Sequence, residues 1–317
     1  GTKSKDKFGK YPICYNTSKL INQTQSNERS YMQELLGKTA IVTGANSGMG
    51  MATTAALRDM GATVIMLCRS KKRGEAALKD LLKANPERSL NMMLCDLGSY
   101  KSIMSFVKEF KDKYVGIDIL VNNAGFISLD RQLTSDGLER QFGINHIGHF
   151  ILTTNLIECM KSGSRIVNVA SGAHKTGRIH FDDINLTKGF NVFTAYSQSK
   201  LANVLFTREL AKRLREKNIT VNCCHPGAVA TNMGVSRETG FGKTITSLLK
   251  PFFQTPAQGA STAIFLATSP EVSKISGEYF YKKKIASSSK KSKDMELASR
   301  LFEFSEELVE KIKNSQT

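Results

Sequence analysis

The feature that most constrains this chain is the alternation of short, continuously apolar segments with longer segments that have helical periodicity. Strands that are apolar at every position, rather than at every second one, are typical of sheets covered on both faces. The repeated strand–helix order implies right-handed crossovers between parallel strands. Strands are expected at 39–44, 62–69, 90–97, 117–125, 164–171 and 219–227, and helices at 48–61, 72–86, 99–114 and from 193 onward.

This pattern predicts an α/β fold, a Rossmann-type doubly wound parallel sheet in a single domain over residues 37–281. No second hydrophobic core is visible along the sequence. Residues 1–36 are polar and lack a sustained period, so we expect a weakly ordered N-terminal extension. Residues 282–317 hold a lysine-rich run, expected to be solvated, followed by an amphipathic helix at the C-terminus.

The composition of the chain limits which binding partners and which cellular environment are expected for it. The formal net charge of +17 favours anionic partners, such as a phosphorylated cofactor, nucleic acid or anionic lipid, without choosing among them. The lysine-rich run lacks the interleaved aromatics of a single-strand binder, so nucleic acid is not expected. The cysteines show neither C-x-x-C nor zinc-type spacing, so no metal is expected. With no apolar stretch long enough for a bilayer and no secretion signal, we expect a cytoplasmic protein without a transmembrane anchor.

A glycine-rich turn, TGANSGMG, joins the first expected strand to the first expected helix. Gly44, Gly48 and Gly50 allow a tight turn whose backbone approaches a pyrophosphate at the helix N-terminus. The spacing G-x-x-x-G-x-G differs from the G-x-G-x-x-G fingerprint, but the strand–turn–helix context favours dinucleotide binding. Close helix packing is the alternative reason for these glycines.

The residue at the end of the second strand bears on the choice of cofactor. An NAD site usually has an acid here that binds the ribose 2′-hydroxyl. This chain has Arg69, followed by Lys71, Lys72 and Arg73. A guanidinium can bind a 2′-phosphate through paired hydrogen bonds, so NADP(H) is favoured, while NAD(H) stays open. The alternative is a cationic surface turn before a helix.

A phenol and an ammonium group lie four residues apart in YSQSK, as Tyr196 and Lys200. Residues i and i+4 share one face of a helix, so the two polar groups can meet. A neighbouring cation favours phenolate, and we expect it to lower the tyrosine pKa, which suits general acid–base chemistry. An exposed tyrosine beside a solvated lysine is the alternative.

Taken in order, the motifs resemble the short-chain dehydrogenase/reductase family over residues 37–280. The resemblance rests on TGANSGMG, on NNAG at 122–125, on FGINHIGHF, RIVNVAS and YSQSK, and on HPGAVAT at 225–231. The segment SKLANVLFTRELAKRL and the long Ser171–Tyr196 interval are similar to its retinol-dehydrogenase-like branch. That branch acts on retinoids and other lipophilic carbonyl compounds, so the resemblance names no single substrate.

The resemblance implies a catalytic set of Asn145, Ser171, Tyr196 and Lys200. Asn145 would bend its helix and hold a water in a proton relay, and Ser171 would bind the substrate oxygen. Tyr196 would exchange a proton with that oxygen, while Lys200 would tune Tyr196 and bind the nicotinamide ribose. A backbone-satisfied helix amide and a turn serine are the structural alternatives for Asn145 and Ser171.

The resemblance also implies the nucleotide contacts. NNAG would line the adenine and ribose pocket, Asp96 and Leu97 would contact adenine, and the segment after Pro226 would hold the nicotinamide amide. Asp96 could equally cap the following helix. The full set is Gly44, Asn46, Ser47, Gly48, Met49, Gly50, Arg69, Asp96, Leu97, Asn123, Ala124, Gly125, Tyr196, Lys200, Pro226, Val229 and Thr231.

The sequence thus predicts an enzyme that transfers a hydride between NADP(H) and a small-molecule carbonyl or alcohol substrate of retinal/retinol-like, lipophilic character. A substrate lid is expected at 232–256, where apolar side chains fit a lipophilic pocket and core packing equally. A homo-oligomer is compatible with the family. A non-catalytic NADP(H)-binding sensor on the same fold is the main alternative. A third hypothesis is a basic protein that binds nucleic acid or a membrane surface through its lysine-rich end.

Overall fold

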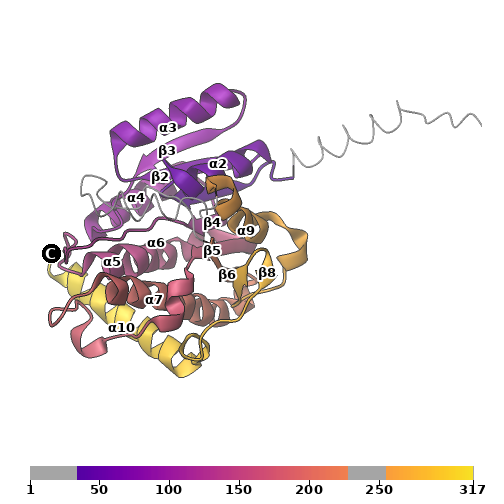
Figure 1. Ribbon diagram of the computed structural model, residues 1–317. Coiled ribbons are helices and arrows are strands. Elements are labelled where there is room, and N and C mark those ends of the chain that lie inside the picture. The colour runs from indigo at the N-terminus through magenta and orange to yellow at the C-terminus, as the bar shows by residue number, and fades with distance from the viewer. Residues whose placement is uncertain (1–33, 228–254, 317) are drawn as a thin grey trace, which may run out of the picture.

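The computed structural model describes residues 34–227 and 255–316 (Figure 1). Its strands form one sheet in the order β3-β2-β1-β4-β5-β6-β7-β8. Neighbouring strands are parallel from β3 through β7, and β8 pairs antiparallel with β7. The strands are β1 (Thr39–Thr43), β2 (Thr63–Cys68), β3 (Leu90–Leu94), β4 (Ile117–Asn122), β5 (Met160–Val169), β6 (Thr220–His225), β7 (Tyr279–Tyr281) and β8 (Lys284–Ile285).

Helices cover both faces of this sheet, which explains why the strands are apolar at every position. On β1, Ile41 belongs to a core shared with α4, α6, α7 and α10, whereas Val42 belongs to a core shared with α2, α3 and α9. The predicted α/β fold with a doubly wound parallel sheet in a single domain is confirmed. The helices are α2 (Gly48–Asp59), α3 (Lys71–Ala84), α4 (Tyr100–Lys113), α5 (Arg140–Phe142), α6 (His149–Leu156), α7 (Val192–Arg213), α9 (Pro256–Thr268) and α10 (Met295–Asn314).

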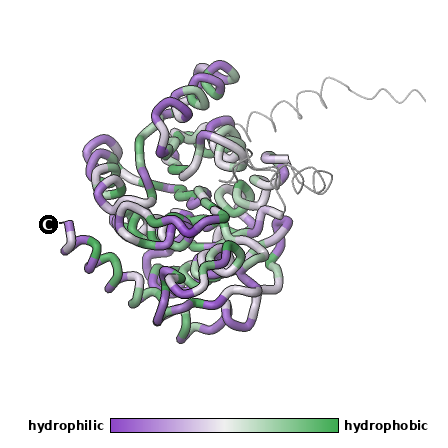
Figure 2. Tube along the Cα trace, turned by 60° about the vertical axis from the view of Figure 1, so that its left-hand side comes forward, coloured by the Kyte–Doolittle hydropathy of each residue, from purple (hydrophilic) through white to green (hydrophobic). Residues whose placement is uncertain are grey.

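The C-terminal helix α10 packs against α7 and completes one of the two cores. Hydrophilic and hydrophobic colours alternate along α10 in Figure 2, as expected for an amphipathic helix. Leu301 and Phe302 are buried with Phe206 of α7, and the Arg213 guanidinium lies 3.9 Å from the centroid of the Phe302 ring. Apolar burial on one stripe, rather than helix propensity alone, therefore stabilises this helix.

Part of the lysine-rich run is more ordered than the sequence suggests. Lys282 and Lys283 have φ values of 49° and 62° and form the turn of a hairpin that adds β8 to the edge of the sheet. Ser292, in the same run, is fully buried. We expected a solvated segment from its charge, but the hairpin and buried serines attach it to the domain. Most of the predicted lid, 232–254, lies outside the described residues.

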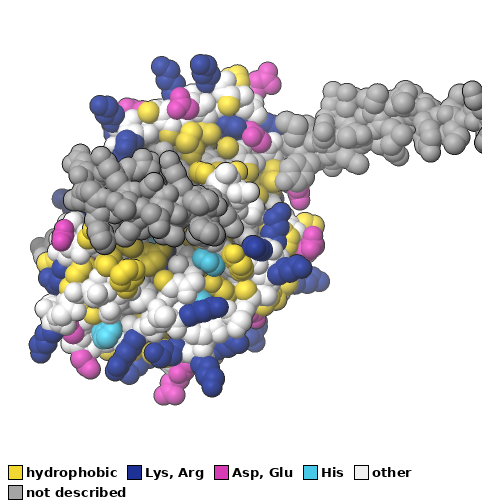
Figure 3. All heavy atoms as spheres, in the orientation of Figure 1, with side chains coloured by type: hydrophobic (Ala, Val, Ile, Leu, Met, Phe, Trp, Pro, Cys, Tyr) yellow, Lys and Arg dark blue, Asp and Glu magenta, His cyan; other side chains and the backbone are white. Residues whose placement is uncertain are grey.

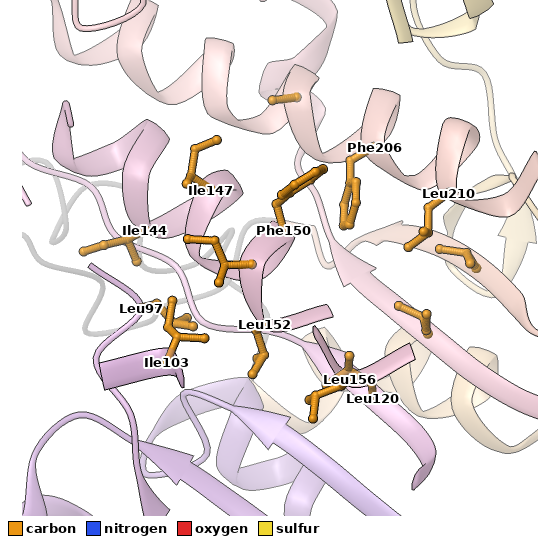
Figure 4. Close-up of a cluster of buried hydrophobic side chains, with 14 of the residues drawn as sticks. Leu97, Ile103, Leu120, Ile144, Ile147, Phe150, Leu152, Leu156, Phe206 and Leu210 are labelled. Carbon is orange, nitrogen blue, oxygen red and sulfur yellow. The ribbon is translucent and has the colours of Figure 1, made fainter. Parts of the chain in front are cut away.

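An element that has no periodic signal in the sequence lies between β4 and β5. Residues Gly143–Gly148 form a π-helical segment between α5 and α6. Figure 4 shows its Ile147 beside Phe150 of α6 and its Ile144 near Leu97 and Ile103, all inside the larger core. Single-turn π-helical segments often occur at functional sites, and this one carries Asn145.

Candidate active site

The glycine-rich turn after β1 forms one wall of a cavity of about 280 Å³ at the carboxyl ends of the strands. Gly44 and Gly48 have φ values of 65° and 52°, which glycine adopts without strain. A Cβ atom at Gly50 would lie 2.2 Å from the Gly44 carbonyl oxygen. The turn thus needs glycine both for its backbone conformation and for its close approach to the start of α2.

Most of the predicted nucleotide contacts line this one cavity. They come from the turn, from the end of β2 and from the segments after β3 and β4, which the parallel sheet brings to one edge. They are Gly44, Asn46, Ser47, Gly48, Met49, Gly50, Arg69, Asp96, Leu97, Asn123, Ala124 and Gly125. Pro226 instead lines a second hollow with His225 and Gln258. Val229 and Thr231 lie outside the described residues.

Several residues of this cavity were not among the predicted contacts. Arg73, in the first turn of α3, lines it together with Arg69. The other unpredicted lining residues are Thr43, Leu67, Cys95, Phe126 and Ile144. The run of basic residues after β2 was a usable signal for Arg73. Nothing local distinguishes Phe126 or Ile144, because a loop and the π-helical segment bring them to the cavity.

Substitution of Gly50 should damage nucleotide binding more than folding. In Gly50→Ala the new methyl group would meet the Gly44 carbonyl and Asn123 Nδ2, at 2.2 and 2.6 Å, so the turn must shift. We expect the dissociation constant for NADPH to rise by about 100-fold, the upper range for losing a hydrogen bond to a charged group such as a phosphate. Gly172→Ala is the control, because its Cβ would lie 3.5 Å or more from other residues. Equal NADPH affinity in both variants would contradict this account of the turn.

Tyr196 and Lys200 lie on α7, whose N-terminus is capped by the Asn191 side chain. The Lys200 Nζ lies 5.6 Å from the centroid of the Tyr196 ring and donates a hydrogen bond to the Val169 carbonyl at 3.1 Å. Ser171 follows β5 and interacts with the Tyr196 side chain. The fold therefore brings these three predicted residues together at the carboxyl end of β5.

Asn145 is attached to the same region by its side chain. Its Oδ1 accepts from the Phe126 N–H at 2.7 Å, and its Nδ2 donates to the Phe126 carbonyl and to Ser199 Oγ, both at 3.0 Å. Ser199 immediately precedes Lys200 on α7. The side chain of Asn145 is thus held in place by protein groups, while its main chain belongs to the π-helical segment.

Burial sets the ionisation of the tyrosine–lysine pair. It raises the pKa of Tyr196, against an opposing interaction with Ser171, and lowers the pKa of the Lys200 ammonium to about 8. The sequence predicted that Lys200 lowers the tyrosine pKa. In the structure Lys200 is buried and Tyr196 is partly buried, and the cost of removing a phenolate from water gives a net upward shift of the Tyr196 pKa.

Comparison with known proteins decides the family. The family profile described as short chain dehydrogenase matches residues 38–240. The chain belongs to the short-chain dehydrogenase family. It is 43% identical to retinol dehydrogenase 14 of Homo sapiens over 296 residues, covering 86% of each protein, and 42% identical to human retinol dehydrogenase 13 over 282 residues, covering 86% of the chain and 85% of that protein.

Solved structures agree with this assignment. A crystal structure of an uncharacterized protein from Mycobacterium paratuberculosis matches with a TM-score of 0.71 and 31% identity, covering 87% of this chain and 94% of that one. A short chain dehydrogenase from Burkholderia cenocepacia in complex with NADP matches with a TM-score of 0.63 and 25% identity, covering 78% and 96%. This short-chain dehydrogenase is therefore a retinol-dehydrogenase-like, NAD(P)(H)-dependent oxidoreductase that acts on alcohol or carbonyl groups.

The described parts of this dehydrogenase contain neither a metal-binding cluster nor a membrane-spanning helix. Across 34–227 and 255–316, histidine, cysteine and acidic side chains form no group of three or more that could bind a metal ion. No helix within those ranges combines the length and the apolar character needed to cross a bilayer.

Proposed function

We propose that this enzyme transfers a hydride between NADP(H) and a lipophilic aldehyde, ketone or alcohol, with Tyr196 as the general acid and base. The observation that carries the cofactor preference is the pair of arginines, Arg69 and Arg73, that line the cavity where β2 ends and α3 begins. Two guanidinium groups can bind a 2′-phosphate through paired hydrogen bonds, whereas an acid at this place would repel it.

Asp96 is the acidic residue that lines the cavity, and it lies away from the end of β2, where an NAD site usually has its acid. Asp96 follows β3, and its Oδ1 accepts a hydrogen bond from the Gly98 N–H at 2.9 Å. This carboxylate therefore shapes its own loop, which supports a place beside the adenine rather than a role in reading the ribose 2′ position. The NADP complex of the related Burkholderia cenocepacia protein also supports the preference.

The proposed chemistry divides between the nucleotide and the side chains. When bound, the nicotinamide supplies or accepts the hydride. Ser171 holds the substrate oxygen beside Tyr196, which donates the proton in reduction and takes it back in oxidation. The buried ammonium of Lys200 favours release of that proton from the phenol and would hold the ribose of the bound nucleotide, and Asn145 supports the return of a proton from solvent.

Several observations support a lipophilic substrate. Two relatives that each match 86% of this chain are named retinol dehydrogenases. Phe193 lies three residues before Tyr196 on α7, on the same side of the helix, and its side chain is 77% exposed. Figure 3 shows hydrophobic side chains on one face, with Lys and Arg side chains both around its outline and across its lower half. An exposed aromatic side chain so near the proposed catalytic tyrosine suits contact with an apolar substrate.

Arg69→Asp tests the cofactor preference. We expect the NADPH dissociation constant to rise about 100-fold relative to that of NADH, because a charge-assisted contact is replaced by repulsion. Lys79→Asp is the matched control, since Lys79 is an exposed cation on α3 that does not line the cavity. Both dissociation constants would be measured by fluorescence titration. An unchanged NADPH/NADH ratio in Arg69→Asp would show that another group reads the 2′ position.

A further inference from the structure

Two buried histidines each contact the main-chain carbonyl of a proposed catalytic residue through Nδ1 and a distant part of the chain through Nε2. His149, the first residue of α6, is 3% exposed. Its Nδ1 lies 3.1 Å from the Asn145 carbonyl oxygen, and its Nε2 lies 2.9 Å from Thr43 Oγ1. The ring thus links the π-helical segment to the end of β1, and His149 and Thr43 are 106 residues apart in sequence.

The partners of His149 determine where its proton lies. The Asn145 carbonyl can only accept a hydrogen bond, so Nδ1 must carry the proton. At the other end, Thr43 Oγ1 accepts from the N–H groups of Asn123 and Ala124, at 2.9 and 2.8 Å. Its own proton can be donated to His149 Nε2 at 2.9 Å, a shorter contact than the 3.5 Å to the Val121 carbonyl, and Nε2 is then unprotonated. Both ends therefore require the same neutral tautomer.

The surroundings of His149 also favour a neutral ring. Burial lowers its pKa to about 4, and the nearby Lys200 ammonium acts in the same direction. A neutral imidazole can donate at one nitrogen and accept at the other, as these contacts need. An imidazolium would have to donate to Thr43 Oγ1, whose two lone pairs are already occupied by the two backbone N–H groups.

His174 repeats the arrangement at Ser171. It is fully buried in the short 3-10 helix after β5, and its Nδ1 lies 2.7 Å from the Ser171 carbonyl oxygen. Its Nε2 accepts from the backbone N–H of Ser289 at 3.3 Å. As for His149, the Ser171 carbonyl requires a proton on Nδ1, and the Ser289 N–H requires an unprotonated Nε2. This ring therefore connects Ser171 to the lysine-rich segment near the C-terminus.

We propose that His149 and His174 are positioning residues that hold the main chains of Asn145 and Ser171 through neutral, Nδ1-protonated rings. The proposal rests on the catalytic roles proposed above for those two residues. Through Thr43, His149 also connects the loop that lines the nucleotide cavity to the segment that carries Asn145. Each histidine thus ties one proposed catalytic residue to a distant part of the fold.

Nuclear magnetic resonance of the 15N-histidine-labelled enzyme tests the tautomers directly and does not depend on turnover. At neutral pH we expect the ring nitrogens of His149 and His174 to have the shifts of the Nδ1-protonated neutral form, with single-site variants assigning the signals. The Nε2-protonated form, or an imidazolium, at either residue would overturn the proposal for that residue.

Two substitutions separate the contacts of His149. His149→Leu loses both, whereas His149→Asn loses the bond to Thr43 but can still donate to the Asn145 carbonyl. Asn155 of this helix already donates in that way, from Nδ2 to the Ile151 carbonyl at 2.8 Å. We expect kcat to fall about 10- to 100-fold in His149→Leu and to return to within about threefold of wild type in His149→Asn. NADPH affinity, which depends on the Thr43 contact, should be similar in the two variants.

His180→Leu is the control, because the His180 ring is only partly buried and its backbone N–H makes the contact with Gln198. A normal kcat in His149→Leu, or equal kcat losses in His149→Leu and His149→Asn, would overturn the positioning role. If His149→Leu does not fold, the wild-type spectra still test the tautomer of His149. A kcat of His149→Asn far below that of the wild type would then contradict the proposed role of the bond to the Asn145 carbonyl. Turnover that persists in Tyr196→Phe would instead contradict the proposed function, so the two failures are distinguishable.

Discussion

Tyr196→Phe is expected to lower kcat by about 10²- to 10⁴-fold, the usual contribution of a general acid–base group. The phenyl ring preserves packing beside Lys200, whose Nζ lies 5.6 Å from the ring centroid, so the fold and the NADPH dissociation constant should change little. The lost atom is the hydroxyl that interacts with Ser171. Single-turnover kinetics with a carbonyl substrate and NADPH would measure the chemical step, and thermal unfolding would confirm that the variant is folded.

Tyr114→Phe is a suitable control, because Tyr114 stacks on Phe110 at the end of α4 and does not line the nucleotide cavity. It should retain the wild-type kcat. A near-normal chemical step in Tyr196→Phe would show that Tyr196 is not the proton donor. The interpretation of YSQSK as a tyrosine beside a structural lysine would then be correct.

Lys200→Met should lower kcat as strongly as Tyr196→Phe, by about 10²-fold or more, and should also weaken NADPH binding. Methionine replaces most of the aliphatic stem but removes the ammonium. Lys200 is 2% exposed, and its Nζ donates to the Val169 carbonyl at 3.1 Å. The positive charge is expected to favour proton release from Tyr196 and to bind the ribose. We expect the NADPH dissociation constant to rise about tenfold, as for the loss of a charge-assisted hydrogen bond.

The comparison between the two variants separates the roles of the pair. Titration with NADPH should find near-normal affinity in Tyr196→Phe and reduced affinity in Lys200→Met. Lys212→Met, at an exposed position of the same helix, controls for the loss of a lysine from α7. Normal NADPH affinity in Lys200→Met would show that this lysine does not bind the ribose. Its proposed role would then be limited to its effect on Tyr196.

The fold was predictable because its signals are local. Continuous apolar segments such as that of β2 reflect burial on both faces, and a helix period follows each of them in the first half of the chain. The cavity was predictable for a related reason. In a parallel sheet the turn at Gly44, the end of β2 at Arg69 and the segment at Asn123 must meet at one edge, and all three line the same cavity.

Features that depend on long-range packing were not predictable. The π-helical segment Gly143–Gly148 has no periodic signature of its own. The contact of His149 with Thr43 joins residues 106 positions apart, so no local pattern marks it. The sign of the Tyr196 pKa shift depends on how completely the phenol and its lysine are buried, which spacing alone does not show.

Transfer of deuterium from NADPH labelled at the nicotinamide C4 position tests the central proposal most directly. The wild-type enzyme would be incubated with the labelled nucleotide and a panel of lipophilic aldehydes and ketones, retinal among them, and the products analysed by mass spectrometry. The proposed function predicts an alcohol product that carries one deuterium, formed faster with NADPH than with NADH. Tight binding of NADPH with no labelled alcohol from any member of the panel would contradict it and favour a nucleotide-binding sensor on the same fold.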